Sequence, residues 1–145
     1  MAALPEAIKA DGEAIVLTLH AQGAQVYEAK ADDTGKLAWV LREPTATLLL
    51  DGITVGRHYA GPTWELTDGS AITGKPVANT PGATDKDIPW LKIEVISRRG
   101  SGQLSDVTTV QRINTRGGKP DAPCTTAGAF LSVGYATDYV FLTKT

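Results

Sequence analysis

Residues 57–70 bring together several side chains that are able to bind a ligand or move a proton. The segment holds His58, Tyr59, Trp64, Glu65, Asp68 and Ser70. The imidazole of His58 can act as a general base near neutral pH, and the carboxylate of Glu65 or Asp68 could orient it. The indole of Trp64 offers a flat face on which a sugar or a planar ligand can stack. We therefore treat this segment as the candidate site.

Two cations further along the chain could complete the site by holding an anion, namely Lys75 and Arg112. The predicted ligand-binding set is thus His58, Tyr59, Trp64, Asp68, Ser70, Lys75 and Arg112. For catalysis the candidates are His58, Glu65 and Asp68, and no catalytic residue is assigned.

The same segment also fits a purely structural interpretation. Gly61-Pro62 would form a bend, Trp64 would belong to the core, and Asp68-Gly69-Ser70 would be a turn in which Asp68 bonds the backbone. Because side chains alternate along a strand, Trp64 would share a face with Leu66, and Glu65 would point to the other face. The sequence leaves both interpretations open.

We expect neither a metal nor a cofactor. With only two histidines, a multi-histidine centre is not indicated, and His20 is expected to be exposed or paired with a neighbour. The single cysteine, Cys124, can form neither an internal disulfide nor a structural zinc site.

Two glycine-containing stretches resemble nucleotide-binding motifs and depart from them at decisive positions. Residues 69–75 match the start of a phosphate-binding loop, but Pro76 stands where a magnesium-binding Ser or Thr is required. Gly100-Ser101-Gly102 lacks the third glycine of the dinucleotide fingerprint. Neither stretch is followed by a helical pattern, and we exclude nucleotide binding.

Charge and hydropathy exclude two further classes of partner. The net charge is −2, so clustered Lys and Arg that could neutralise nucleic acid phosphates are lacking. The longest apolar run, residues 47–50, is far shorter than the roughly 20 residues of a membrane-spanning helix.

The elements that must position the candidate residues are short strands. Apolar and polar residues alternate, or β-branched residues cluster, in the runs 15–20, 24–30, 37–42, 91–97, 107–113 and 135–142. Asp-Gly turn signals separate several runs, as at Asp51-Gly52. The pattern predicts one all-β domain over residues 1–145, an antiparallel barrel or sandwich of eight or nine strands with little helix.

Three local features complete this prediction. We expect residues 1–12 to be an N-terminal extension or a short helix. Glu43-Pro44 is expected to end a strand, because proline has no backbone N–H. Residues 74–88, rich in Pro, Asn and Asp, are expected to form a long loop.

Several stretches along the chain together resemble one family: 23–27, 56–64, 68–70, 88–91, 110–115, 117–118 and 135–139, together with Trp39, Pro44 and Ala46. They are similar to the bacterial and fungal family known as domain of unknown function 3455. The resemblance implies an exported protein, periplasmic or extracellular, and the abrupt start at Met1 suggests that a signal peptide has been removed. Some fungal relatives carry a malate dehydrogenase label, which the missing dinucleotide fingerprint does not support. Relatives often have a cysteine where this chain has Glu28-Ala29, so a disulfide from there to Cys124 is not expected.

These observations favour a non-enzymatic module that binds a small molecule, a carbohydrate or a surface. One alternative is a small hydrolase or isomerase that uses His58 with Glu65 or Asp68. Another is a structural or assembly protein, because exposed strand edges can pair between chains. The sequence does not fix the oligomeric state.

Overall fold

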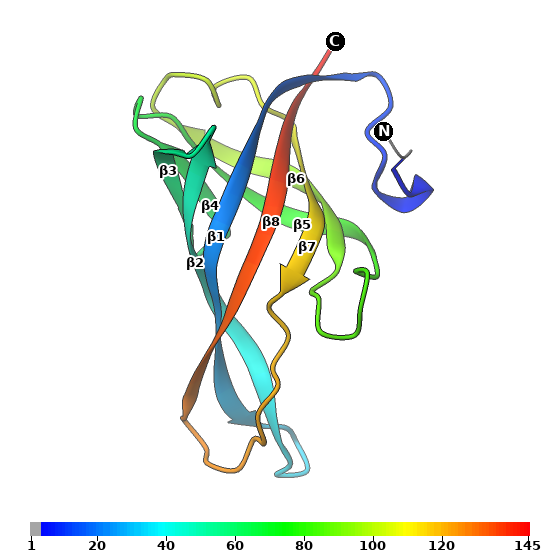
Figure 1. The fold of residues 1–145 in the computed structure, drawn as a ribbon, viewed down its shortest axis with the longest axis vertical. Coiled ribbons are helices and arrows are strands. Elements are labelled where there is room, and N and C mark those ends of the chain that lie inside the picture. Colours follow the sequence, from blue (N-terminus) through cyan, green and yellow to red (C-terminus); the bar gives the residue numbers. More distant parts are fainter. Residues whose placement is uncertain (1–3) are drawn as a thin grey trace.

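The computed structural model describes residues 4–145 as a single antiparallel sheet of eight strands closed into a barrel (Figure 1). Each strand pairs with the next, and β8 pairs back onto β1. The strands are β1 (Glu13–Ala31), β2 (Leu37–Leu50), β3 (Ile53–Tyr59), β4 (Thr63–Leu66), β5 (Ala71–Thr80), β6 (Trp90–Arg99), β7 (Thr109–Gly117) and β8 (Phe130–Lys144). The predicted all-β class is confirmed.

Strand alternation fills the barrel with apolar side chains. Trp64 and Leu66 on β4 are buried and Glu65 between them is not, as the alternation predicts. The core that surrounds them draws on most of the strands and on the loop before β7: Leu19, Leu48, Ile72, Ile93, Leu104, Val110, Tyr139 and Phe141. Trp39 and Trp90 are only half-buried.

The β2–β3 hairpin has the two-residue turn that its sequence predicts. Leu50 pairs with Ile53, and the residues between them, Asp51 and Gly52, have φ angles of 50° and 80°. Positive φ at both central positions is the type I′ geometry, whose twist matches that of paired strands.

Three strands are much longer than the others. β1, β2 and β8 continue side by side beyond the barrel as a twisted ribbon (Figure 1). β1 lies in the middle of this ribbon, where Glu28 pairs with Val40 of β2 and with Phe130 of β8.

Two sequence-based boundaries are wrong. β5 runs through Gly74–Thr80, so the long loop predicted over 74–88 is shorter, and β2 continues through Pro44. In each case the register shifts near the proline. The pairing of β5 with β6 shifts between Pro76 and Ala78, and the pairing of β2 with β1 shifts between Leu41 and Glu43, next to Pro44. A bulge accommodates a residue that cannot donate to the ladder, which the proline signal alone does not reveal.

The N-terminal segment includes one short 3₁₀ turn, η1 (Glu6–Ile8). Ile8 is fully buried, and Gln111 Nε2 donates a hydrogen bond of 2.8 Å to its carbonyl oxygen. Part of the segment expected to be an extension is therefore packed onto the barrel, while residues 1–3 lie outside the described residues.

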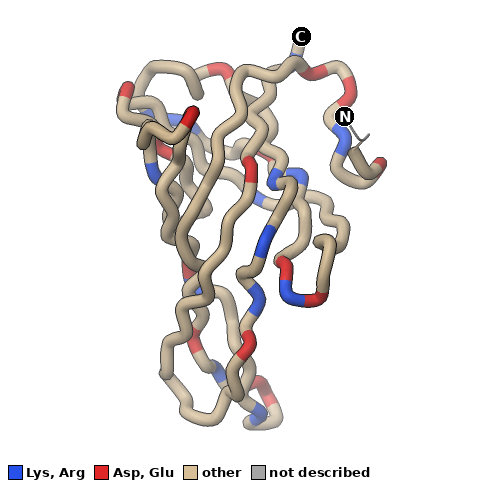
Figure 2. The backbone as a smooth tube through the Cα atoms, in the orientation of Figure 1, with Lys and Arg blue, Asp and Glu red and all other residues tan. Residues whose placement is uncertain are grey.

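Acidic and basic residues are interspersed along the backbone (Figure 2). This distribution agrees with the small net charge. Over residues 4–145 no helix has the length and apolar character needed to traverse a bilayer.

Candidate ligand-binding site

A cavity of about 320 Å³ opens into the barrel and brings together three of the predicted site residues. His58 comes from β3, Trp64 from β4 and Arg112 from β7. Gln25 and Tyr139 also line it, and most of the remaining lining is apolar: Leu41, Pro44, Gly61, Pro62, Pro76, Leu91 and Ile93. Arg42 and Glu43 line it as well and form an ion pair with each other at 3.7 Å, so their charges offset one another.

Aromatic packing holds the floor of this cavity. His58 pairs with Trp64 across the β3–β4 ladder, and their rings stack with centroids 4.5 Å apart and planes 19° from parallel. Tyr139 lies against both rings, at centroid distances of 5.0 Å from His58 and 5.4 Å from Trp64. Such contacts restrict the rotamers of the three rings and give the site a defined shape.

His58 is held in its neutral form. Its Nδ1 lies 2.9 Å from the carbonyl oxygen of Thr63, which can only accept, so Nδ1 carries the proton and Nε2 presents a lone pair. Burial lowers the pKa of His58 to about 4; the Thr63 hydrogen bond opposes this shift, and the positive charge of Arg112 adds to it. At neutral pH the side chain is an uncharged acceptor.

Arg112 is a buried cation without an acidic partner. It is only 9% exposed, and its Nε and Nη2 donate to the carbonyl oxygen of Pro89 at 3.0 and 2.8 Å. Over residues 4–145 no Asp or Glu forms an ion pair with it. Its aromatic neighbours do not supply negative charge, because burial raises the pKa of Tyr135 and of Tyr139.

Two polar side-chain atoms of the cavity residues lack a hydrogen-bond partner in residues 4–145. The Oε1 atom of Gln25 and the Nε1 atom of Trp64 are buried and make no hydrogen bond within the described part of the chain. Gln25 is 3% exposed and Trp64 is fully buried. Buried polar groups are nearly always paired, so an unpaired donor, acceptor and cation around one cavity are the features of a site that is completed by a ligand.

A family model described as a protein of unknown function (DUF3455) matches residues 50–143. The chain belongs to the DUF3455 family. The matched region includes His58, Trp64, Arg112 and Tyr139 and excludes Gln25. No curated protein and no solved structure matches the chain.

The other predicted residues of this DUF3455 protein do not line the cavity. Tyr59 and Glu65 lie on the outer face, where the Tyr59 hydroxyl donates to Glu65 Oε1 at 2.6 Å and Arg99 Nη2 donates to the same oxygen at 3.1 Å. The hydrogen bond from Tyr59, followed by that from Arg99, lowers the pKa of Glu65. Lys75 is exposed and pairs in register with Glu94 of β6.

Asp68 and Ser70 form the turn that the structural interpretation proposed. Asp68 Oδ1 accepts from the backbone N–H and the hydroxyl of Ser70, and Oδ2 accepts from the backbone N–H of Gln103. The Ser70 hydroxyl contributes most to the lowered pKa of Asp68. These two residues fasten the turn after β4 to the loop that follows β6.

Sequence reasoning missed Gln25 and Tyr139. Both lie in runs that the sequence pattern marked as strands, and Gln25 stands at an inward position, on the same face as the buried Tyr27 two residues later. The sequence alone shows a glutamine at an inward position of a strand. It cannot show that this residue lines a cavity, because that depends on which strands form the other side of the barrel.

Proposed function

We propose that this protein binds a small organic anion, with a carboxylate or similar group and an apolar body, inside the barrel. The observation that carries the proposal is Arg112, a buried guanidinium without an acidic partner in residues 4–145, at the wall of a mainly apolar cavity. An uncompensated buried charge costs several kcal/mol, and a bidentate carboxylate would offset that cost.

The other polar atoms define what else the ligand should carry. Trp64 Nε1 is a donor, whereas Gln25 Oε1 and the Nε2 of neutral His58 are acceptors. A ligand with one acceptor and one hydroxyl or N–H donor beyond its anionic group would satisfy them. The volume, about 320 Å³, is at the lower end of the range for small-molecule sites.

The geometry gives less support to the two alternatives. His58 has a pKa of about 4, which makes it a weak base, and Glu65 and Asp68 bond other partners. Pairing between chains needs a free strand edge. Over residues 4–145, β8 closes onto β1, which leaves such edges mainly in the ribbon, where β3 does not pair with β2 and β7 does not pair with β8.

Binding of matched ligands would test the proposal. We would compare benzoate and hexanoate with benzamide and hexanamide, by thermal shift and calorimetry, on the wild type, Arg112→Met and the control Arg57→Met. Arg57 is exposed on β3 and lies outside the cavity. We expect both carboxylates to raise the Tm of the wild type and of Arg57→Met, and the amides to have little effect.

Arg112→Met should lose this response while remaining folded, because methionine removes a buried charge that has no acidic partner, which offsets the loss of the two hydrogen bonds to the Pro89 carbonyl. If this variant fails to fold, titrating the wild type with each acid and its amide, followed by tryptophan fluorescence, still shows whether the carboxylate is required for binding. Equal responses to acid and amide, or an unchanged response in Arg112→Met, would refute the proposal.

Export to the periplasm or the cell exterior is part of the same proposal and is supported by the family resemblance alone. Fractionation of cells that express the native gene would test it, and recovery only from the cytoplasm would contradict it.

A further inference from the structure

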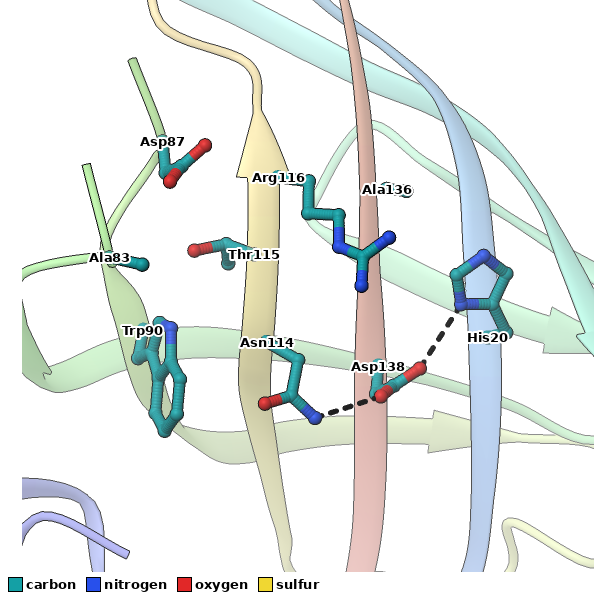
Figure 3. Close-up of a pocket in the computed structure, with 9 residues that line it drawn as sticks. All are labelled: His20, Ala83, Asp87, Trp90, Asn114, Thr115, Arg116, Ala136 and Asp138. Atoms are coloured by element: carbon teal, nitrogen blue, oxygen red, sulfur yellow. Dashed lines mark hydrogen bonds and ion pairs between the residues drawn. The ribbon is translucent and has the colours of Figure 1, made fainter. Parts of the chain in front are cut away.

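A second hollow, of about 450 Å³, shares no lining residue with the interior cavity; Figure 3 shows the residues that line it. His20 of β1, Asn114 and Arg116 of β7 and Asp138 of β8 point into it, and Trp90 at the start of β6 lies across from them. None of these residues lines the interior cavity, so the inference that follows is independent of the proposed function.

Asp138 is held from both sides. His20 Nδ1 lies 3.1 Å from Asp138 Oδ1, and Asn114 Nδ2 donates to Asp138 Oδ2 at 3.0 Å (Figure 3). Because a carboxylate only accepts, His20 Nδ1 carries a proton and donates it to this hydrogen bond. Asn114 uses its amide N–H, which leaves Oδ1 as an acceptor.

A β-bulge places the β7 residues. The β7–β8 register shifts between Ile113 and Arg116, and Asn114 has a φ angle of 54°, in the left-handed region. Thr115 is turned inward, where its hydroxyl donates to the carbonyl oxygen of Ile88 at 2.6 Å. Asn114 and Arg116 on either side of it therefore face the hollow together.

The charges of the hollow argue against a strongly charged ligand. Asp138 and Asp87 line it with Arg116, which forms no ion pair with the residues described here. Asp87 accepts from the backbone N–H groups of Gly117 and Thr84 and from the Thr84 hydroxyl. An anion would meet the two carboxylates, and a cation would meet the guanidinium, so neither is favoured.

The hollow is lined by both hydrogen-bond donors and hydrogen-bond acceptors. Arg116 has N–H donors, and the buried Nε1 of Trp90 has no partner within residues 4–145. Asn114 Oδ1 and the carboxylate oxygens of Asp138 are acceptors. A hydroxyl group both donates and accepts, and adjacent hydroxyls on a ring can satisfy such a set together.

We propose that the hollow bounded by His20, Trp90, Asn114, Arg116 and Asp138 is a binding site for a neutral saccharide. The two sites differ in ligand class: the interior cavity is mainly apolar with one cation that has no acidic partner, and this hollow is polar and carries charges of both signs.

Titration of the ¹⁵N-labelled full chain with sugars, followed by NMR, tests this proposal. The probes would be glucose, xylose and cellobiose, with glucuronate and glucosamine as charged counterparts. We expect saturable shifts at the Trp90 indole N–H, the Asn114 amide and the His20 ring, with a Kd on the order of 1 mM. Neutral sugars should bind more tightly than either charged analogue.

Asn114→Ala and Arg116→Ala should each weaken binding about tenfold, because each removes a hydrogen-bonding group. Asn79→Ala, at an exposed position on β5, is the matched control and should bind as the wild type does. If Asn114→Ala disturbs the bulge, the exposed Arg116→Ala still provides the test. Absence of saturable shifts, shifts clustered elsewhere, or tighter binding of a charged analogue would overturn the proposal.

Discussion

Lowering the pH from 7 to 5 should destabilise the folded barrel through His58. Burial lowers the pKa of His58 to about 4, against 6.5 for an unperturbed histidine. As the pH falls, the unfolded chain takes up this proton first, so stability is fully present above pH 6.5 and is lost down to about pH 4. The difference of about 2.5 in pKa corresponds to about 3 kcal/mol in total, and to about 2 kcal/mol at pH 5.

The assay is urea unfolding, followed by tryptophan fluorescence, at pH 7, 6 and 5. His58→Gln removes the titration and keeps an amide N–H for the Thr63 carbonyl; His20→Gln is the control, because His20 is 42% exposed. The wild type and His20→Gln should lose about 2 kcal/mol more than His58→Gln between pH 7 and 5. Equal pH slopes in all three proteins, or an NMR titration that places the His58 midpoint near 6.5, would refute the reasoning.

Three further predictions concern the packing and hydrogen bonds of the barrel around the sites. Gly23→Ala should cost about 3 kcal/mol in a urea titration, because a Cβ there would overlap the backbone of β2, whereas Gly134→Ala has room and should cost far less. Asp68→Ala should speed hydrogen exchange at the Gln103 amide about tenfold by removing its acceptor, and unchanged exchange would contradict the assigned bond. Leu48→Ala should cost about 3 kcal/mol of unfolding free energy, since the side chain is fully buried; a loss below about 1 kcal/mol would mean that this position is not core.

Local sequence was sufficient for the features that depend on neighbouring residues. Alternation placed Trp64 inward and Glu65 outward, because successive side chains of a strand point to opposite faces. Asp51-Gly52 indicated a tight hairpin, because glycine adopts positive φ without steric cost. The all-β class follows from the same two patterns repeated along the chain.

Only the tertiary structure decided which side chains share a site. His58 and Arg112 meet because strands distant in sequence form opposite walls of one barrel, and Asp68 is excluded because its oxygens are used by a turn and a loop. His20 meets Asp138, 118 residues away, because β8 closes onto β1. Pairing at such separations depends on register and barrel closure, which local patterns do not encode.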